Sequence, residues 1–271
     1  MIKFTIATCT WNAAAQLPPT LASIRAQDYP CIEHLIIDGA SSDDSLRLLH
    51  DYEVQAPANV KVRIVSEPDH GLYDAMNKAL RLAEGDYILF LNAGDRLHSP
   101  QTLSLVAQAA EKVSQTGSCG VLYGDTDIVD AAGHFIRHRR LAPPEHLNWR
   151  SFRQGMLVCH QAFMASVPLA RECPYNLHYR YSADFDWCIR IMQMSSQRHM
   201  PLCNTHQVIA DYLEGGMTTK NHRASLRERF DVMRRHYGLC QTVALHLWFC
   251  VCVCVCVCAH TVTCVAFTIA P

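Results

Sequence analysis

The amino-terminal part of the chain alternates between short apolar runs and amphipathic segments, and this alternation determines the fold class. Apolar runs with the length of a strand occupy residues 2–8, 33–37, 60–65 and 87–91. Between these runs, apolar side chains recur at the spacing of a helix face, in segments that begin near residues 17, 46, 72 and 99. A repeated strand–helix order favours a mainly parallel, doubly wound sheet with helices on both faces. The sequence therefore predicts an α/β fold.

Polar side chains stand where the predicted strands end, at the sheet edge where open α/β folds bind ligands. Asp38 follows the second strand, Glu67 and Asp69 follow the third, and Asn92 and Asp95 follow the fourth. Mg²⁺ and Mn²⁺ bind carboxylates together with the oxygens of a phosphorylated ligand. An Asn-x-Gly-Asp sequence is also an ordinary turn. Its position after a buried strand is what favours a metal site.

Composition excludes some partners and some classes of site. The 271 residues carry a net charge of -1 with a pI near 6.9, so bulk charge gives no support for a nucleic-acid partner. Half of the 14 cysteines are scattered singly and form no C-x-x-C pair, so they predict neither a zinc site nor a disulfide framework. The other half lie after residue 239, most of them in a Val-Cys repeat of low complexity.

The pattern changes in the second half of the chain. Residues 121–125 and 134–137 are expected to form two strands joined by an Ala-Ala-Gly turn, and Ser182 is expected to cap a helix that runs through Met192. The arginine-rich residues 223–237 carry an apolar stripe, typical either of a membrane-surface helix or of a helix packed on the domain. We expect this half to complete and cover the sheet, rather than to fold independently.

The two ends of the chain carry different signals, and only the carboxyl-terminal tail is expected to take no part in catalysis. Residues 1–6 predict a strand and not a charged, apolar leader, so the amino-terminal domain is expected in the cytoplasm. Residues 242–270 are almost free of charge and long enough to span a bilayer. The Val-Cys repeat within them is what an alternating GT dinucleotide tract would encode, which points to a frameshifted or read-through end.

Five segments carry a family signature when they are taken together and in order. They are residues 8–12 (TCTWN), 37–43 (IDGASSD), 66–78 (SEPDHGLYDAMNK), 90–95 (FLNAGD) and 183–187 (ADFDW). With these segments, residues 2–220 resemble glycosyltransferase family 2, the inverting nucleotide-sugar transferases. The resemblance is closest to the bacterial branch that assembles exopolysaccharide and lipopolysaccharide repeat units. It implies a GT-A fold with a Rossmann-like sheet.

The resemblance implies how a nucleoside-diphosphate sugar would be held. Asp95 would ligate Mg²⁺ or Mn²⁺, and the cation would bridge the diphosphate. Asn92 and Gly94 stand where many members have aspartates, so this turn departs from the usual Asp-x-Asp. Lys78 would either reach the phosphates or be a solvated side chain. The other residues expected to contact the sugar nucleotide are Thr8, Thr10, Asn12, Asp38, Glu67, Asp69, Asn77 and Asn92.

The same resemblance implies an acceptor side. Asp184, near the start of a predicted helix, aligns with the general base that deprotonates the acceptor hydroxyl, although Ala183 replaces the frequent glutamate before it. Asp186 is the second candidate for the base, with a helix-capping or surface carboxylate as its alternative. His160 and Gln161 are expected either to line the acceptor side or to be structural.

The predicted function is an inverting, metal-dependent glycosyltransferase that works at the inner face of the cell membrane and adds one sugar to a saccharide or lipid-linked acceptor. Within one domain, residues 1–118 would bind the nucleotide sugar and residues 119–238 the acceptor, with 239–271 as a hydrophobic tail. The basic run at 137–140 would meet a lipid-linked pyrophosphate or lie on a solvated hairpin.

Three other functions are weighed against this one. A catalytically impaired sugar-nucleotide-binding protein remains an alternative, because Asn92 and Gly94 replace aspartates. A nucleotidyltransferase is a second alternative, although the first loop lacks the glycine-rich, basic sequence that such enzymes use on triphosphates. A processive synthase is disfavoured, because the sequence has no Gln-x-x-Arg-Trp motif.

Overall fold

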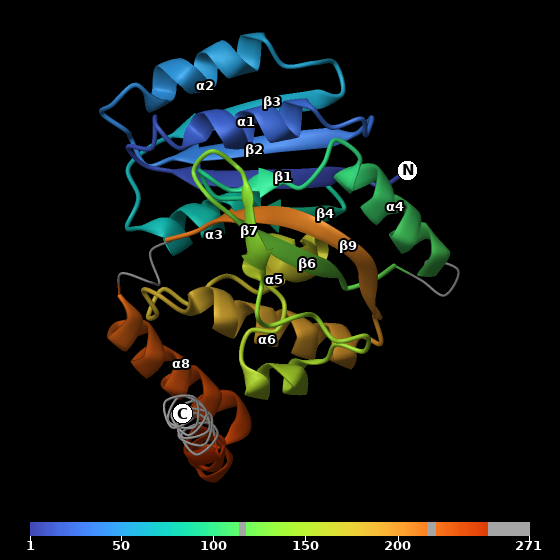
Figure 1. Ribbon diagram of the computed structural model, residues 1–271, viewed down its shortest axis with the longest axis vertical. Coiled ribbons are helices and arrows are strands. Elements are labelled where there is room, and N and C mark those ends of the chain that lie inside the picture. The colour runs from blue at the N-terminus through green and yellow to red at the C-terminus, as the bar shows by residue number, and fades with distance from the viewer. Residues whose placement is uncertain (114–117, 216–220, 249–271) are drawn as a thin grey trace, which may run out of the picture.

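The computed structural model describes residues 1–113, 118–215 and 221–248. Its centre is a nine-stranded mixed sheet with helices against both faces (Figure 1). From one edge to the other, the strands are β3 (Val60–Ser66), β2 (Ile32–Asp38), β1 (Phe4–Thr10), β4 (Tyr87–Phe90), β8 (Phe163–Ser166), β6 (Val121–Val129), β9 (Leu202–Leu213) and β5 (Arg96–Leu97), with β7 (Phe135–His138) beside β6. Both halves of the chain therefore contribute to one sheet.

The first four strands along the chain are parallel, as the alternating pattern predicts. Every residue of β1 and β2 is buried, as in parallel sheets covered on both faces. The helices of this part are α1 (Leu17–Arg25), α2 (Ser45–Val54), α3 (Leu72–Leu82) and α4 (Thr102–Val113). α4 begins at Thr102 and not at Pro100, because the Thr102 N–H donates to the Ser99 carbonyl and its hydroxyl accepts the Ser99 N–H, which closes a turn before the helix.

The second half of the chain makes the sheet mixed. The expected hairpin is present as antiparallel β6 and β7, and β8 runs antiparallel to both β4 and β6. β9 was not expected from the apolar pattern; it is parallel to β6 and antiparallel to the two-residue β5. Helices of this half include η2 (Trp149–Gln154), η3 (His160–Ala162), α5 (Val167–Glu172), α6 (Ala183–Gln197) and α8 (His222–Tyr237).

α8 packs on the domain at the end of the molecule that is remote from β3 (Figure 1). Val232 and Met233 are buried, whereas Leu226 is 49% exposed, so only part of the apolar stripe faces the protein. Residues 239–248 are helical, and no helix in the described part of the chain is long and apolar enough to cross a bilayer. The Val-Cys repeat and the rest of the tail from residue 249 lie outside the described residues.

β2 carries a histidine whose imidazole is completely buried. The Thr8 hydroxyl donates to the Leu91 carbonyl, so it accepts a hydrogen bond from His34 Nε2. His34 Nδ1 in turn accepts from the Tyr52 hydroxyl. Both ring nitrogens are satisfied by the neutral imidazole, and burial lowers the pKa of His34 to about 3.

We expect the contribution of His34 to the free energy of unfolding to fall as the pH is lowered below 6.5, whereas the raised pKa of Asp95 contributes in the opposite direction. The unfolded chain protonates His34 at its ordinary pKa of 6.5, whereas the folded protein resists protonation down to about pH 3. The histidine alone should therefore lower stability by about 2 kcal/mol between pH 7 and pH 5. Urea unfolding at both pH values measures this loss. It should disappear in His34→Gln and persist in His50→Gln, which changes an exposed histidine; the same pH dependence in all three proteins would contradict the assignment.

Candidate active site

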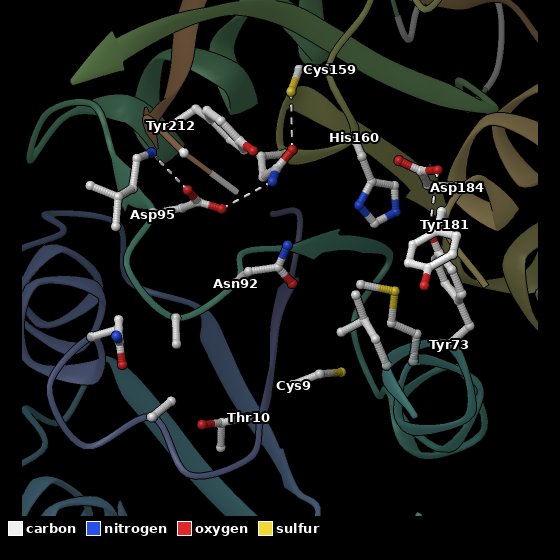
Figure 2. A pocket seen from close by; sticks show the side chains of 18 of the residues that line it. Cys9, Thr10, Tyr73, Asn92, Asp95, Cys159, His160, Tyr181, Asp184 and Tyr212 are labelled. Atoms are coloured by element: carbon white, nitrogen blue, oxygen red, sulfur yellow. Dashed lines mark hydrogen bonds between the residues drawn. The ribbon is translucent and has the colours of Figure 1, made fainter. Parts of the chain in front are cut away.

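A cavity of about 650 Å³ lies at the carboxyl ends of β1 and β4, where segments of the second half meet them (Figure 2). Thr10, Asn92 and Asp95 line it from the first half, and Gln161 and Asp184 line it from the second. Figure 2 shows Asp95 and Asp184 on opposite sides of the cavity, with Asn92 between them. The structure therefore brings the two carboxylates singled out in the sequence into one cavity.

Asp95 is held in the turn after β4 by contacts to the second half of the chain. Its carboxylate accepts hydrogen bonds from Gln161 Nε2 and from the Leu213 backbone N–H, each 3.0 Å long. Burial raises its pKa to about 7, although these hydrogen bonds favour the ionised form. Gly94 has a φ of +102°, and a Cβ there would lie 2.8 Å from Leu213 Cδ2. The turn therefore needs glycine where many family members carry an aspartate.

Two buried oxygen atoms in the cavity wall have no hydrogen-bond partner among the described residues. They are Asn92 Oδ1 and Thr10 Oγ1. A buried polar atom without a partner is uncommon in native proteins, so both positions suit a ligand or an ion. Asn92 Oδ1 and the Asp95 carboxylate are hard oxygen ligands of the kind that Mg²⁺ and Mn²⁺ take alongside phosphate oxygens. The residues present therefore fit a divalent cation.

A separate group of metal-ligating side chains lies outside the cavity. His98, Asp127 and Asp211 offer ligand atoms that all lie within 4.8 Å of one another. His98 Nδ1 is 2.7 Å from Asp211 Oδ1, and His138 Nδ1 is 2.8 Å from Asp127 Oδ1. These are two histidine–aspartate pairs, and none of the four residues lines the cavity. Asp95 lines the cavity and this group does not, and a metal at Asp95 stays a prediction.

Asp184 lies in the first turn of α6 and lines the cavity. The Tyr73 hydroxyl, at the start of α3, donates to Asp184 Oδ1 over 3.3 Å. Asp186 faces α8 instead: its carboxylate is 2.7 Å from Arg190 Nε and 2.8 Å from His236 Nε2, and it does not line the cavity. Of the two candidates for the base, Asp184 is the one placed to meet a substrate.

Several residues expected to contact the sugar nucleotide form hydrogen bonds within the loops around the cavity. Asp38 accepts hydrogen bonds from the N–H and hydroxyl of Ser41 and from the Ser66 hydroxyl, so it ties the loop after β2 to the end of β3. Asn12, with a φ of +47°, accepts from the Ser42 N–H. Neither Asp38 nor Asn12 lines the cavity.

Glu67, Asp69 and Thr8 are also engaged outside the cavity. Glu67 Oε1 is 2.9 Å from Lys78 Nζ, and Asp69 accepts from the Gly71 N–H. Thr8 is fully buried beside His34, as described above. Lys78 is itself buried in its ion pair, so it is not the solvated side chain that one sequence interpretation expected.

Asn77 and His160 both hold Tyr175. The Asn77 side chain donates to the Tyr175 carbonyl over 3.0 Å and accepts the Tyr175 N–H over 2.7 Å. His160 Nε2 lies 2.6 Å from the Tyr175 hydroxyl, and its ring stacks on Phe90. His160 also lines the cavity, whereas Asn77 does not. Asn77 therefore fixes the segment that follows α5 onto α3.

We expect Asn77→Ala to destabilise the protein by about 2–3 kcal/mol, since it removes two buried hydrogen bonds and leaves the Tyr175 backbone unpaired. Urea unfolding measures the loss, with Arg81→Ala on the exposed side of α3 as the control. Affinity for a sugar nucleotide should be unchanged wherever the variant is folded. A loss of that affinity without a loss of stability would show that Asn77 contacts the ligand.

Sequence reasoning missed several residues of the cavity wall. Tyr73 belongs to the 66–78 segment, but its contact with Asp184 joins positions that are 111 residues apart. Arg180 and Arg229 line the cavity from segments that carry no motif. The one available signal was the density of arginines in α8, which sequence analysis connected with a membrane surface.

Comparisons with known proteins place the chain among glycosyltransferases. The family model described as Glycosyl transferase family 2 matches residues 5–169. The PGL/p-HBAD biosynthesis glycosyltransferase of Mycobacterium bovis (strain BCG / Pasteur 1173P2) is 34% identical over 218 residues, which cover 79% of this chain and 77% of that protein. The amylovoran biosynthesis glycosyltransferase AmsB of Erwinia amylovora is 27% identical, over 76% of this chain and 70% of that protein.

Solved structures share the architecture. S. aureus TarS 1–349 in complex with UDP-GlcNAc superposes with a TM-score of 0.66 at 17% identity. The superposition covers 86% of this chain and 65% of the TarS chain, so this chain spans just under two thirds of TarS 1–349. The mannosyltransferase PcManGT from Pyrobaculum calidifontis, in complex with GDP-Man and Mn²⁺, superposes with a TM-score of 0.65 at 18% identity, over 91% and 70%. These similarities confirm the GT-A fold. The match of the family model to more than half of the residues shows that the chain belongs to glycosyl transferase family 2.

Proposed function

We propose that the protein transfers a sugar from a nucleoside-diphosphate sugar to a hydroxyl group, with inversion at the anomeric carbon. The observation that carries the proposal is the shared cavity, with Asp95 and Asp184 on opposite sides and Asn92 between them. Inverting transfer needs a base at the acceptor and stabilisation of the departing diphosphate away from that base. The position of the two carboxylates on opposite sides of the cavity supports this division of roles.

The proposed sugar donor is a nucleoside-diphosphate sugar. TarS and PcManGT, which share the fold, are described in complex with UDP-GlcNAc and with GDP-Man and Mn²⁺. In this chain, Thr10 Oγ1 and Asn92 Oδ1 are the unpartnered atoms that such a ligand would meet. Trp11 is 67% exposed and lines the cavity beside Thr10, as a platform for a nucleobase. Mg²⁺ or Mn²⁺ held by Asp95 and Asn92 would supply Lewis-acid stabilisation of the diphosphate.

The proposed general base is Asp184. Its carboxylate would take the proton of the acceptor hydroxyl as the acceptor oxygen forms its bond to the anomeric carbon. The hydrogen bond from the Tyr73 hydroxyl to Oδ1 orients this carboxylate toward the cavity. Since Tyr73 lies on α3 and Asp184 on α6, the position of the base depends on both halves of the chain.

The proposed acceptor is a saccharide or a lipid-linked saccharide in the synthesis of a surface polysaccharide or glycolipid. The relatives are named for PGL/p-HBAD and amylovoran biosynthesis, which supports this class. Leu226 and Trp248 are exposed near the outward-facing arginines of α8, Arg223 and Arg227. Exposed apolar side chains beside basic ones support peripheral contact of this end with the inner face of the cell membrane.

Binding and hydrolysis of a panel of nucleotide sugars, with and without Mn²⁺, test the proposal and name the sugar donor. We expect one sugar nucleotide to bind and to be slowly hydrolysed when the divalent cation is present. Binding without any turnover, across varied acceptors, would favour a sugar-nucleotide-binding protein instead. If no sugar nucleotide binds, the proposed function is wrong.

A further inference from the structure

Three arginines line the cavity, and their guanidinium groups have different contacts. Arg139 donates to three backbone carbonyls in the wall, so it supports the wall itself. Arg180 and Arg229 form no ion pair within the described residues. Their guanidinium groups stack on aromatic rings, Arg180 over Tyr181 and Arg229 over Phe185. Two of the three arginines in the cavity therefore carry a charge that no carboxylate of the described chain neutralises.

Arg229 has an unmet hydrogen-bond donor as well as an unmet charge. Its Nε is buried and has no acceptor among the described residues. Removing a charged N–H group from water without a partner is costly. A neighbour on the same helix avoids this cost, because Arg234 pairs with Asp231 at 2.7 Å. Arg96 and Arg153 also have a buried Nε without an acceptor, but they do not line the cavity, so it is the place of Arg229 in the cavity wall that suits its Nε to a ligand.

α8 and the loop before α6 hold both arginines beside Asp184. Glu228 on α8 accepts hydrogen bonds from the backbone N–H groups of Arg180 and Tyr181, over 2.9 Å and 2.8 Å. Arg229 is the next residue on α8, and Asp184 lies four residues after Arg180. The Glu228 carboxylate thus joins α8 to the loop before α6, and Arg180, Arg229 and Asp184 all line the cavity.

We propose that Arg180 and Arg229 form an anion subsite for the acceptor, which would carry a phosphate or carboxylate group next to the hydroxyl that Asp184 meets. This inference rests on the proposed function, because it takes Asp184 to be on the acceptor side. A guanidinium binds either anion through a planar set of N–H donors. The sugar donor is the poorer occupant, since Asp95 lies across the cavity from Asp184 (Figure 2).

Binding of matched anionic and neutral sugars tests the subsite. With the nucleotide position saturated by UDP or GDP and Mn²⁺, the wild-type protein should bind glucose 1-phosphate or glucuronate roughly 10-fold more tightly than methyl glucoside. Arg180→Met and Arg229→Met keep an apolar stem without the charge, and each should abolish this preference. Arg227→Met, on the exposed side of α8, changes the net charge equally and should retain it. Thermal unfolding checks that each variant is folded, and the two cavity variants test the subsite independently.

Affinity for UDP or GDP should be the same in all three variants. If Arg229→Met and Arg180→Met weaken the binding of UDP or GDP and leave the preference for anionic sugars unchanged, the two arginines bind the diphosphate of the nucleotide. The inference is then wrong. It is also wrong if the wild-type protein binds charged and neutral sugars equally, or binds neither. If the wild-type protein binds no nucleotide, the proposed function fails, and that outcome is separate from any result with the anionic sugars.

Discussion

Asp184→Asn should lower the rate of sugar transfer by about 10³-fold while leaving the affinity for the sugar nucleotide nearly unchanged. The amide has the shape of the carboxylate, and its oxygen can still accept the Tyr73 hydroxyl. It cannot take a proton from the acceptor. Because the proposed nucleotide position lies across the cavity, binding of the sugar nucleotide should not depend on this change. Steady-state kinetics together with calorimetric titration measures both quantities.

Asp186→Asn is the matched control, since it makes the same chemical change two residues away on α6. It weakens the contacts with Arg190 and His236, so we expect a lower free energy of unfolding and retained turnover by the folded protein. Full activity in Asp184→Asn combined with loss of activity in Asp186→Asn would transfer the role of base to Asp186.

Asp95→Asn should abolish the metal dependence of nucleotide binding and lower transfer by roughly 100-fold or more. The amide oxygen can still accept the Leu213 N–H, whereas the hydrogen bond from Gln161 Nε2 is lost, so thermal unfolding must show that the variant is folded. It lacks the charge that holds a divalent cation. The first measurement is independent of activity: Mn²⁺ with UDP or GDP should raise the melting temperature of the wild-type protein and should fail to raise that of the variant.

Asp211→Asn is the matched control for the metal. It alters the histidine–aspartate group of His98, Asp127 and Asp211, which lies outside the cavity. The stabilisation by Mn²⁺ with nucleotide should survive this change. If it is lost in Asp211→Asn and kept in Asp95→Asn, the cation binds at that group and the assignment of Asp95 is wrong.

The parallel half of the fold could be predicted because its signals are local. Each of the strands β1 to β4 is a short apolar run, and each helix between them repeats its apolar residues at helical spacing within a dozen positions. Asp95 could be singled out from its place after a buried strand, whereas Asp184 was singled out only through the resemblance to glycosyltransferase family 2. β9 escaped prediction because its apolar pattern is interrupted: His206 has a φ of +55°, and its pairing with β6 shifts register.

The roles of the remaining polar residues could not be predicted, because a polar side chain near a ligand and one that supports a loop look alike in sequence. Asp38 and Asn77 stand in the segments that resemble the family, and their partners decide their function. Asn77 bonds Tyr175, which is 98 positions away. Asp186 differs from Asp184 only in which face of α6 it occupies, and only packing against α8 separates them.

The hydrogen bond between Asp95 and the Leu213 N–H has a consequence for when the cavity forms during synthesis and folding of the chain. Its two residues are 118 positions apart, and β5, directly after Asp95, pairs with β9. A chain still emerging from the ribosome contains Thr10, Asn92 and Asp95 long before β9 has been synthesised. Contacts of such large sequence separation form late in folding. Nascent and truncated chains are therefore expected to lack a finished site for the proposed sugar nucleotide, so that only chains that include β9 would bind it.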